Sequence, residues 1–402
     1  MKLPDFMSAQ TLEQHIKHTL AFYEPNVLDA NGGFFQHFRD DGSIYDADTR
    51  HLVSSTRFVF NYAMAARHFK DDSYLPWVEH GLNYLETAHR PANTQSIKQG
   101  YSWVLGKDGV LDATNHCYGL AFVIVAGATA LLAGVEAGRK SLETAWSIME
   151  AHFWDEDAGL YRDEANADFS VIDPYRGQNA NMHSCEAMLW AYEATGEVRY
   201  LDRAELLANN ISRVQAAKSG DLVWEHYTSD WNIDWEYNKD DPKNLFRPWG
   251  FQPGHQTEWT KLLLILNRHR PNDWLIPTAK ALFDSALDIS WDCENGGMCY
   301  GFDLDGNVCD GDKYFWVQAE SFAAAALLAQ ATGDSTYTDW YNKLWKYSWE
   351  HMIDHKHGAW YRILTQDNQK MDDLKSPAGK TDYHTMGACY EVLRSEFLEN
   401  PS

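Results

Sequence analysis

The segment Gly296-Gly297-Met298-Cys299-Tyr300 belongs to a short element that the sequence repeats and that decides the fold. Related copies lie about 60 to 76 residues apart, at Gly32-Gly33-Phe34-Phe35, Gly100-Tyr101-Ser102-Trp103, Gly159-Leu160-Tyr161, Gly220-Asp221-Leu222-Val223-Trp224 and Gly358-Ala359-Trp360-Tyr361. A glycine followed by aromatic or β-branched residues is typical of a tight turn and a short extended piece. Regular repetition of this kind indicates a repeat architecture.

Each glycine element stands between two segments with helical spacing. The preceding segments are amphipathic and begin near Thr11, Tyr74, Arg139, Val198, Asp273 and Tyr337. The following segments are poor in charge and begin near Ser54, Asn115, Asn181, His255, Phe315 and His384. A helix that is apolar nearly all round is a buried one, so the second set predicts inner helices and the first set outer helices.

Six such pairs predict an all-α fold, an (α/α)6 barrel or toroid of six helical hairpins with short β-type turns at one end. We expect a single catalytic domain over residues 1–402, because no linker or change in composition divides the chain. A long α-solenoid is the alternative, but its end repeats are usually polar caps, and none is evident. The longest irregular stretch, 230–247, is predicted to be a loop over one end of the ring, and whether it closes as a lid stays open.

Composition excludes several classes of partner. The 34 basic and 58 acidic residues give a net charge of −24, which is unsuited to nucleic acid or an anionic membrane. The longest apolar stretch, 119–134, falls short of the ~20 residues of a membrane span, so we expect a buried helix there. The six cysteines show no C-x-x-C pairing and the N-terminus has no apolar signal, which favours a cytoplasmic protein with reduced thiols.

Polar residues recur near the start of every inner helix. They are Arg57, His116, His183, His255 with Glu258, Gln318 with Glu320, and His384, at successive gaps of 59, 67, 72, 63 and 66 residues. A lone histidine there is commonly a capping or core residue, Arg57 could serve a structural ion pair, and Glu320 could complement the helix dipole. Recurrence in phase with the fold favours one shared polar pocket at a mouth of the barrel.

The residue types in this set favour acid–base chemistry. Histidines with an acid could hold zinc, but no two lie at metal-ligand spacing on one helix, so we expect no metal and no cofactor. A helix N-terminus disfavours a charged imidazole, which would keep His255 or His384 neutral and able to accept a proton. Glu258 shares a helix face with His255 and could orient it. Trp316 offers a ring face for a sugar, and Asn179 offers an amide to its hydroxyls.

Four segments resemble motifs of the N-acylglucosamine 2-epimerase superfamily. Pro253-Gly254-His255-Gln256-Thr257-Glu258 resembles its Pro-Gly-His-x-x-Glu signature, and the resemblance runs along essentially the whole chain. Similar in kind and order are Ser54-Ser55-Thr56-Arg57, Asn179-Ala180-Asn181-Met182-His183 and Asp382-Tyr383-His384. The family has an (α/α)6 barrel, in agreement with the repeat count.

The resemblance implies that His255 and His384 are the two catalytic histidines. One would open the sugar ring or exchange a proton on one face, and His384 would remove the proton from C2 of the open-chain aldose. Arg57 would polarise the carbonyl group and stabilise the enediolate. The remaining expected substrate contacts are His116, Asn179, His183, Arg247, Glu258, Trp316, Gln318 and Glu320.

Within the family, residues 51–60 and 247–253 look most like members that interconvert D-mannose and D-fructose through a cis-enediol. We therefore expect an aldose–ketose isomerase for a neutral monosaccharide, extending to D-lyxose and D-xylulose, in a monomer or weak homo-oligomer. Sugar 2-epimerisation and sulfoquinovose isomerisation remain alternatives. An inverting glycoside hydrolase would need two carboxylates about 6.5–9.5 Å apart, and Glu258 with Glu320 is the obvious pair. A lectin-like or scaffold toroid is the non-catalytic alternative.

Overall fold

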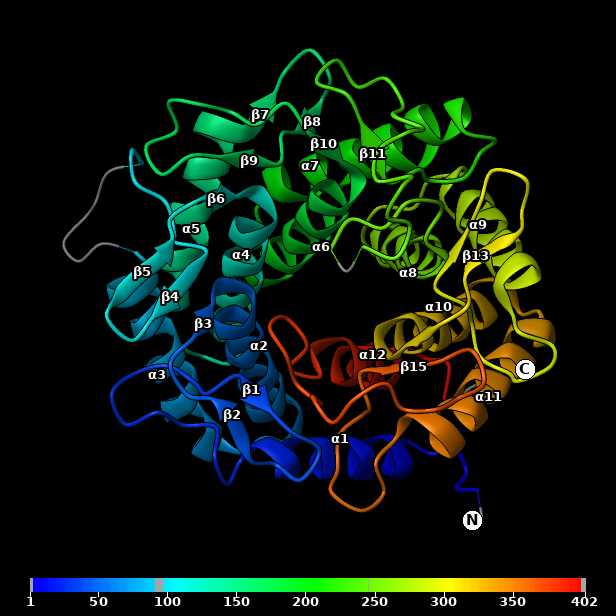
Figure 1. Ribbon diagram of the computed structural model, residues 1–402, viewed down its shortest axis with the longest axis horizontal. Coiled ribbons are helices and arrows are strands. Elements are labelled where there is room, and N and C mark those ends of the chain that lie inside the picture. The colour runs from blue at the N-terminus through cyan, green and yellow to red at the C-terminus, as the bar shows by residue number, and fades with distance from the viewer. Residues whose placement is uncertain (1–2, 91–96, 245, 399–402) are drawn as a thin grey trace.

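The computed structural model describes residues 3–90, 97–244 and 246–398. Over these ranges the chain forms two concentric rings of helices around a common axis (Figure 1). The inner ring consists of α2 (Leu52–Phe69), α4 (Cys117–Leu132), α6 (Gln178–Thr195), α8 (Pro253–His269), α10 (Phe315–Thr332) and α12 (Tyr383–Arg394). These starts lie within three residues of the predicted ones, and the prediction of an all-α (α/α)6 barrel is confirmed.

The outer ring covers the inner one. It consists of α1 (Ala9–Tyr23), α3 (Leu75–Tyr84), α5 (Gly138–Ile148), α7 (Val198–Asn209), α9 (Leu275–Ser290) and α11 (Ser335–Tyr347). Short helical turns extend several of these ends: η1 (Asp72–Tyr74), η2 (Leu85–His89), η3 (Met149–Phe153), η4 (Asn210–Gln215), η5 (Ala216–Lys218) and η6 (Ser348–Met352).

The ring is closed by contacts between its two ends. The first inner helix, α2, packs on the last, α12, and α12 is covered by α1 from the start of the chain. Figure 1 shows the blue α1 lying beside the red α12. A solenoid would leave these ends apart, so the alternative is wrong. One hydrophobic cluster runs through all twelve of these helices. This agrees with the expected single domain over residues 1–402. For the terminal residues outside the described ranges, the domain bounds remain a prediction.

Short antiparallel strands join neighbouring hairpins at one end of the barrel. The strand before an inner helix pairs with a strand from the next connection: β3 with β4, β6 with β9, β10 with β11, and β14 with β15. Single bridges, Phe251 to Phe302 and Phe38 to Ser376, complete the circle. The strands are β1 (His37–Phe38), β2 (Ile44–Asp46), β3 (Arg50–His51), β4 (Val104–Gly106), β5 (Gly109–Asp112), β6 (Asn115–His116), β7 (Trp154–Asp155), β8 (Leu160–Tyr161), β9 (Glu164–Ala165), β10 (Arg176–Gly177), β11 (His226–Tyr227), β12 (Gly301–Phe302), β13 (Val308–Asp310), β14 (Lys313–Tyr314) and β15 (Ile363–Leu364).

An amide in the first turn of an inner helix holds several of the glycine elements in place. The side chain of Asn181 accepts from the backbone N–H of Tyr161 and donates to its carbonyl. Gln256 makes the same pair of bonds with Val223, and Gln318 makes it with Met298. Both bonds between Gln318 and Met298 are 2.9 Å long. A buried amide that satisfies both backbone groups fixes the turn against the helix at little desolvation cost.

The apolar stretch 119–134 forms the buried helix α4, as predicted. No helix among the described residues is long and apolar enough to cross a membrane. All six cysteines are free thiols.

The predicted loop 230–247 is irregular, as expected, and is bound to both neighbouring connections; residue 245 lies outside the described residues. Lys243 pairs with Asp310 and Asp312 on one side, and Arg247 pairs with Glu164 on the other. The loop therefore lies across the strand-bearing end of the barrel. A lid movement stays a prediction.

Candidate active site

All six inner helices contribute to one buried polar cluster. It comprises Arg57 from α2, Tyr118 from α4, His183 and Glu186 from α6, Glu258 and Lys261 from α8, Glu320 from α10, and Tyr383 and His384 from α12. Polar contacts join neighbouring members around the ring, among them Arg57 to His384 and His384 to Glu320. The predicted convergence of inner-helix polar residues is therefore present in the structure.

His384 is held between a carboxylate and a guanidinium. Its Nδ1 lies 2.7 Å from Oε1 of Glu320, and its Nε2 lies 3.2 Å from Nη2 of Arg57. Because a guanidinium can only donate, Nε2 must be the accepting nitrogen and Nδ1 must carry the hydrogen. Glu320 accepts that hydrogen, which leaves the lone pair of Nε2 as a base.

The environment keeps this imidazole neutral. Burial lowers the pKa of His384 well below its usual value, and the positive charge of Arg57 acts in the same direction. A neutral imidazole with a fixed tautomer is what general-base catalysis near pH 7 requires.

Arg57 is itself fixed by its surroundings. Its guanidinium stacks against the rings of Phe122 and Tyr383, with its carbon 4.4 and 4.8 Å from their centroids. It donates to the hydroxyl of Tyr118 at 3.0 Å and to the carbonyl of Gly379. A fixed cation beside the base is suited to stabilise negative charge that develops on a substrate oxygen.

His255 receives a comparable orientation from a residue that the sequence did not reveal. Its Nδ1 lies 2.9 Å from Oε2 of Glu225. The indole N–H of Trp259 donates to the amide oxygen of Gln178, whose nitrogen donates to the same Glu225 oxygen at 3.0 Å. Since this oxygen is thereby an acceptor, Nδ1 of His255 carries the hydrogen and Nε2 is left for chemistry.

Trp316 lies between the two histidines. Its ring centroid is 4.9 Å from that of His255 and 5.8 Å from that of His384. The glycine of the Pro-Gly-His segment makes room for it, because a Cβ on Gly254 would stand 2.5 Å from the indole. The indole thus sets the spacing of the two imidazoles.

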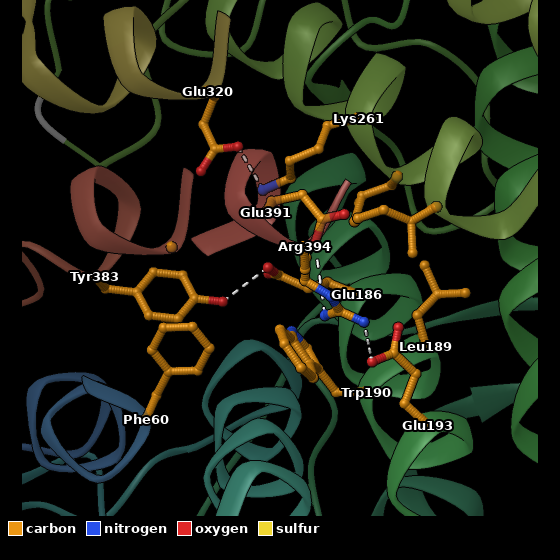
Figure 2. A pocket seen from close by; sticks show the side chains of 13 residues that line it. Phe60, Glu186, Leu189, Trp190, Glu193, Lys261, Glu320, Tyr383, Glu391 and Arg394 are labelled. Carbon is orange, nitrogen blue, oxygen red and sulfur yellow. Dashed lines mark hydrogen bonds and ion pairs between the residues drawn. The ribbon is translucent and has the colours of Figure 1, made fainter. Parts of the chain in front are cut away.

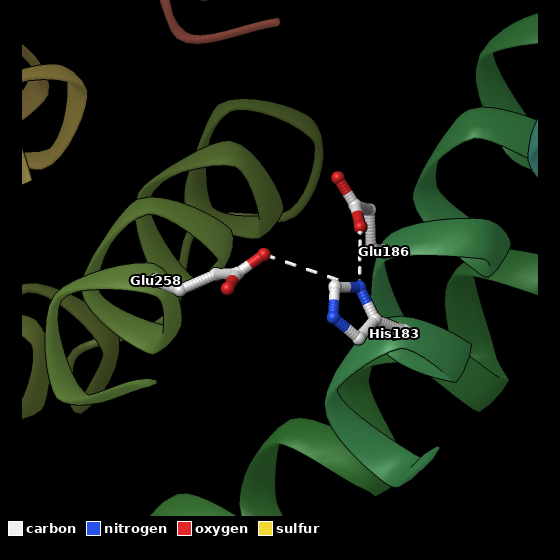
Figure 3. A group of neighbouring side chains, drawn as sticks. All are labelled: His183, Glu186 and Glu258. Atoms are coloured by element: carbon white, nitrogen blue, oxygen red, sulfur yellow. Dashed lines mark hydrogen bonds and ion pairs between the residues drawn. The ribbon is translucent and has the colours of Figure 1, made fainter. Parts of the chain in front are cut away.

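Figure 3 shows Glu258 and Glu186 approaching His183 from different helices. Nδ1 of His183 is 2.9 Å from Glu186 and 3.9 Å from Glu258. Burial raises the pKa of Glu186, but bonds from His183 and the charge of Lys261 outweigh it and lower the value to about 2. Burial and the charge of Glu320 raise the pKa of Glu258 well above normal, which favours the neutral acid.

Both oxygens of Glu258 are buried without a hydrogen-bond partner among the described residues. A protonated carboxyl of this kind can donate one hydrogen bond and accept another. Glu225, and not Glu258, contacts Nδ1 of His255. Glu258 is instead available to a substrate hydroxyl.

A pocket is lined by part of this cluster and by residues further along α6, α8 and α12 (Figure 2). Lys261, Glu320, Glu186 and Tyr383 line it together with Arg394. Two contacts within the cluster therefore border the pocket: Tyr383 to Glu186, which bonds His183, and Lys261 to Glu320, which bonds His384.

Two expected substrate contacts lie nearer the rim. His116 stacks on Trp103 with centroids 3.8 Å apart, and its Nδ1 is 3.3 Å from Glu164. Arg247 pairs with the same carboxylate and stacks over Tyr175. Asn179 stands in the first turn of α6, and its amide oxygen has no partner among the described residues.

Two expected substrate contacts are corrected by the geometry. The amide of Gln318 is fully occupied by the backbone of Met298, as described above, because the hairpin turn needs it. Glu320 is occupied by His384 and Lys261, so it acts on the base and not on the substrate.

Some residues of the cluster carried a usable sequence signal. His183 and Glu186 repeat the three-residue spacing of His255 and Glu258, and Lys261 is a charge inside a leucine-rich helix. Glu225 carried no such signal, because it lies in a connection and meets His255 only through the fold.

The cluster also contains possible metal ligands. One set is His183, Glu186 and Glu258, and another is Glu258, Glu320 and His384, with ligand atoms within 4.8 Å of one another. The expected absence of a metal therefore needs a direct test. The same distance places Glu258 and Glu320 closer together than the about 6.5–9.5 Å of an inverting glycosidase, which removes the support for that alternative.

The fold and this histidine–arginine site define a class of sugar-converting toroids. The N-acylglucosamine 2-epimerase family matches residues 33–388, and the chain belongs to that family.

Among its relatives, the chain is 57% identical to the D-mannose isomerase of Marinomonas mediterranea, covering 98% of this chain and 99% of that protein. It is 32% identical to the D-mannose isomerase of Pseudomonas cannabina pv. alisalensis, covering 92% and 89%. A crystal structure of a D-mannose isomerase superposes with a TM-score of 0.95 at 57% identity, over 98% of this chain and 100% of that one. The cellobiose 2-epimerase of Bacillus thermoamylovorans, at 18% identity and a TM-score of 0.83 over 96% and 98%, shares the fold.

Proposed function

We propose that this protein is an aldose–ketose isomerase that interconverts D-mannose and D-fructose through a cis-enediol. The observation that carries the proposal is the unprotonated Nε2 of His384, which accepts a hydrogen bond from the guanidinium of Arg57 at 3.2 Å. The likeness to proteins named D-mannose isomerase over nearly the whole chain supports the choice of sugar.

The reaction begins with ring opening, which we assign to His255. Its Nε2 exchanges a proton with the ring oxygen and O1 of the pyranose, while Trp316 stacks on the C–H face of the sugar. Glu225 holds the imidazole in the tautomer that this step needs.

Proton transfer from carbon follows. His384 takes the proton from C2, the C2–H electrons form the C1–C2 double bond, and the carbonyl electrons move to O1. Arg57 stabilises the negative charge on O1. The proton of the C2 hydroxyl passes to O1, the O2 electrons form the C2 carbonyl, and the C1–C2 double-bond electrons take the proton back from His384 at C1, which completes the ketose. His183, Asn179, Glu258, His116 and Arg247 are proposed hydroxyl contacts.

A proton NMR assay in deuterated water tests this proposal. EDTA-treated protein is expected to convert unlabelled D-mannose to fructose that carries deuterium at C1, and D-lyxose to D-xylulose. Retained activity after EDTA would support the metal-free mechanism, whereas loss restored by added zinc would contradict it. Unchanged mannose would overturn the proposal.

The second candidate, sugar 2-epimerisation, is favoured by the second oriented histidine. His255 could deliver a proton to C2 from the face opposite His384. In the same assay, glucose with deuterium at C2 and little fructose would favour this candidate. Sulfoquinovose, cellobiose and N-acetylglucosamine would then be tested in turn.

We also propose a cytoplasmic location and a monomeric or weakly associating state. Six free thiols favour a reducing compartment, and the net charge of −24 disfavours close association. Light scattering across protein concentration tests the association state.

A further inference from the structure

The barrel interior contains a lysine for which the proposed reaction has no direct use. Lys261 lies in α8, and its side chain is 7% exposed. Its Nζ is 2.5 Å from Oε2 of Glu320, whose Oε1 is 2.7 Å from Nδ1 of His384. Figure 2 shows the ammonium directed at this carboxylate.

A buried ammonium requires strong compensation. Burial by itself lowers the pKa of Lys261, but the charge of Glu320, supported by that of Glu186, outweighs it and raises the value above normal. Lys261 is therefore charged, and its ammonium group pairs with the carboxylate of Glu320.

Glu320 needs this charge more than its neighbours do. Burial raises the pKa of Glu320 above normal, and Lys261 provides the largest opposing effect. Glu186 has bonds from His183 and Tyr383, whereas Lys261 is the only cation paired with Glu320 among the described residues. Without Lys261, Oε2 of Glu320 would lose its ion pair, and Oε1 would no longer be held at 2.7 Å from Nδ1 of His384.

We propose that Lys261 is a positioning residue that holds Glu320 where it accepts Nδ1–H of His384, which leaves the lone pair of the neutral imidazole on Nε2. The consequence for catalysis rests on the proposed function, in which His384 is the base. The consequence for the histidine tautomer does not, because Arg57 and Glu320 act on His384 with or without substrate.

The charge of Lys261 sets the expected direction of the pH effect. Loss of Lys261 removes a positive charge that opposes protonation of His384, so the pKa of the imidazole should rise. The acid limb of the activity profile should therefore move to higher pH. The charged or titratable groups that face His384 are Arg57 (α2), Tyr118 (α4), His183 and Glu186 (α6), Glu258 and Lys261 (α8), Glu320 (α10) and Tyr383 (α12).

The test compares Lys261→Met with wild type over a range of pH, using mannose as substrate. At pH 7 we expect kcat to fall about 10-fold or more while KM changes little, since Lys261 acts through the base. The acid limb should move up by about one pH unit, and alkaline pH should restore much of the rate. A lowered kcat without a shift of the acid limb of the pH profile would overturn the proposal.

The matched control is Lys313→Met, which removes another buried lysine paired with a carboxylate, Asp292 at 2.8 Å. Lys313 lies in β14, outside the polar cluster, so a loss of stability there should leave the acid limb in place. The same shift in both variants would overturn a specific role for Lys261.

A double-mutant cycle covers the case in which Lys261→Met fails to fold. The double variant Glu320→Gln/Lys261→Met removes both members of the ion pair, so it lacks the unpaired buried charge that makes each single variant fragile. When Lys261→Met is added to Glu320→Gln, kcat should fall by less than about a further 2-fold, because both substitutions act on the same bond between Glu320 and His384. A further 10-fold fall in kcat would overturn the proposal.

Nitrogen-15 NMR of histidine-labelled protein gives a readout without turnover. Wild-type His384, assigned with His384→Asn, should show hydrogen on Nδ1 at pH 7, and Glu320→Gln/Lys261→Met should show a weaker preference. If this holds while mannose is not turned over, the proposed function fails and the positioning role stands. Hydrogen on Nε2 in the wild type would overturn the positioning role.

Discussion

The two histidines of the site, His384 and His255, are oriented on one plan and face different surroundings. In each, a carboxylate accepts the hydrogen of Nδ1 and leaves Nε2 free, with Glu320 at 2.7 Å and Glu225 at 2.9 Å. Nε2 of His384 lies beside Arg57, whereas His255 lies against Trp316 and is more exposed. The shared plan makes two bases, and the unequal surroundings divide proton transfer at carbon from ring opening.

The largest expected effect comes from removing one base at a time. His384→Ala should lower deuterium exchange at C2 by about 100-fold or more. His255→Ala should slow turnover of mannopyranose but spare exchange in glyceraldehyde, an aldose too short to close into a furanose or pyranose ring. Mass spectrometry of both substrates measures this difference. C2 exchange that survives in His384→Ala would assign the base elsewhere.

Arg57→Lys tests what distinguishes the His384 side. A lysine keeps the charge but loses the forked donors that reach Tyr118 and the substrate oxygen together. We expect kcat/KM to fall about 10- to 100-fold with the fold intact, because a misplaced charge stabilises the enediolate poorly. Steady-state kinetics with circular dichroism provide the measurement. Wild-type rates would show that charge alone suffices.

Glu225→Gln tests the His255 side. The amide can still contact the ring but no longer favours hydrogen on Nδ1, so we expect about a 10-fold loss on mannose. Because Glu225 is proposed to act through His255, exchange in glyceraldehyde should be less affected. Equal losses on both substrates would contradict the division of labour.

Glu258→Gln should have a smaller effect and a diagnostic pH dependence. The raised pKa of Glu258 keeps the carboxyl neutral, and a contact made by the neutral acid is lost as pH rises through that pKa. A glutamine amide also donates a hydrogen bond and does not titrate. The variant should therefore retain most activity near pH 7, and its kcat/KM should not fall at alkaline pH. Profiles of kcat/KM against pH check this. An alkaline limb that is identical in both proteins would point to another group.

Gly254→Ala should have the smallest effect. The added Cβ would meet the indole of Trp316 at 2.5 Å and displace it. A loss of several-fold, on the order of 1 kcal/mol, is expected for both histidines' steps. Tryptophan fluorescence with kinetics would detect the shift. Full activity would show that the indole position is not critical.

The sequence alone could predict the inner helices and the polar face that they share. Glycine turns recur with the hairpins, and a histidine or arginine such as Arg57 in an apolar helix must find a polar setting wherever that helix is buried. For the same reason, the repeat pattern by itself places His183, His255 and His384 at one end of the barrel. The Pro-Gly-His segment added the expected roles of His255 and His384.

Only the tertiary structure decided which carboxylate orients which histidine. Glu225 and Glu320 stand 30 and 64 residues from the histidines that they orient, so their pairing depends on strand and helix packing and not on local spacing. Gln318 looked like a substrate contact because polarity in an apolar helix does not reveal its partner. Protonation is likewise a collective property: Glu258 is neutral and Glu186 is charged because burial and the neighbouring charges act on them unequally.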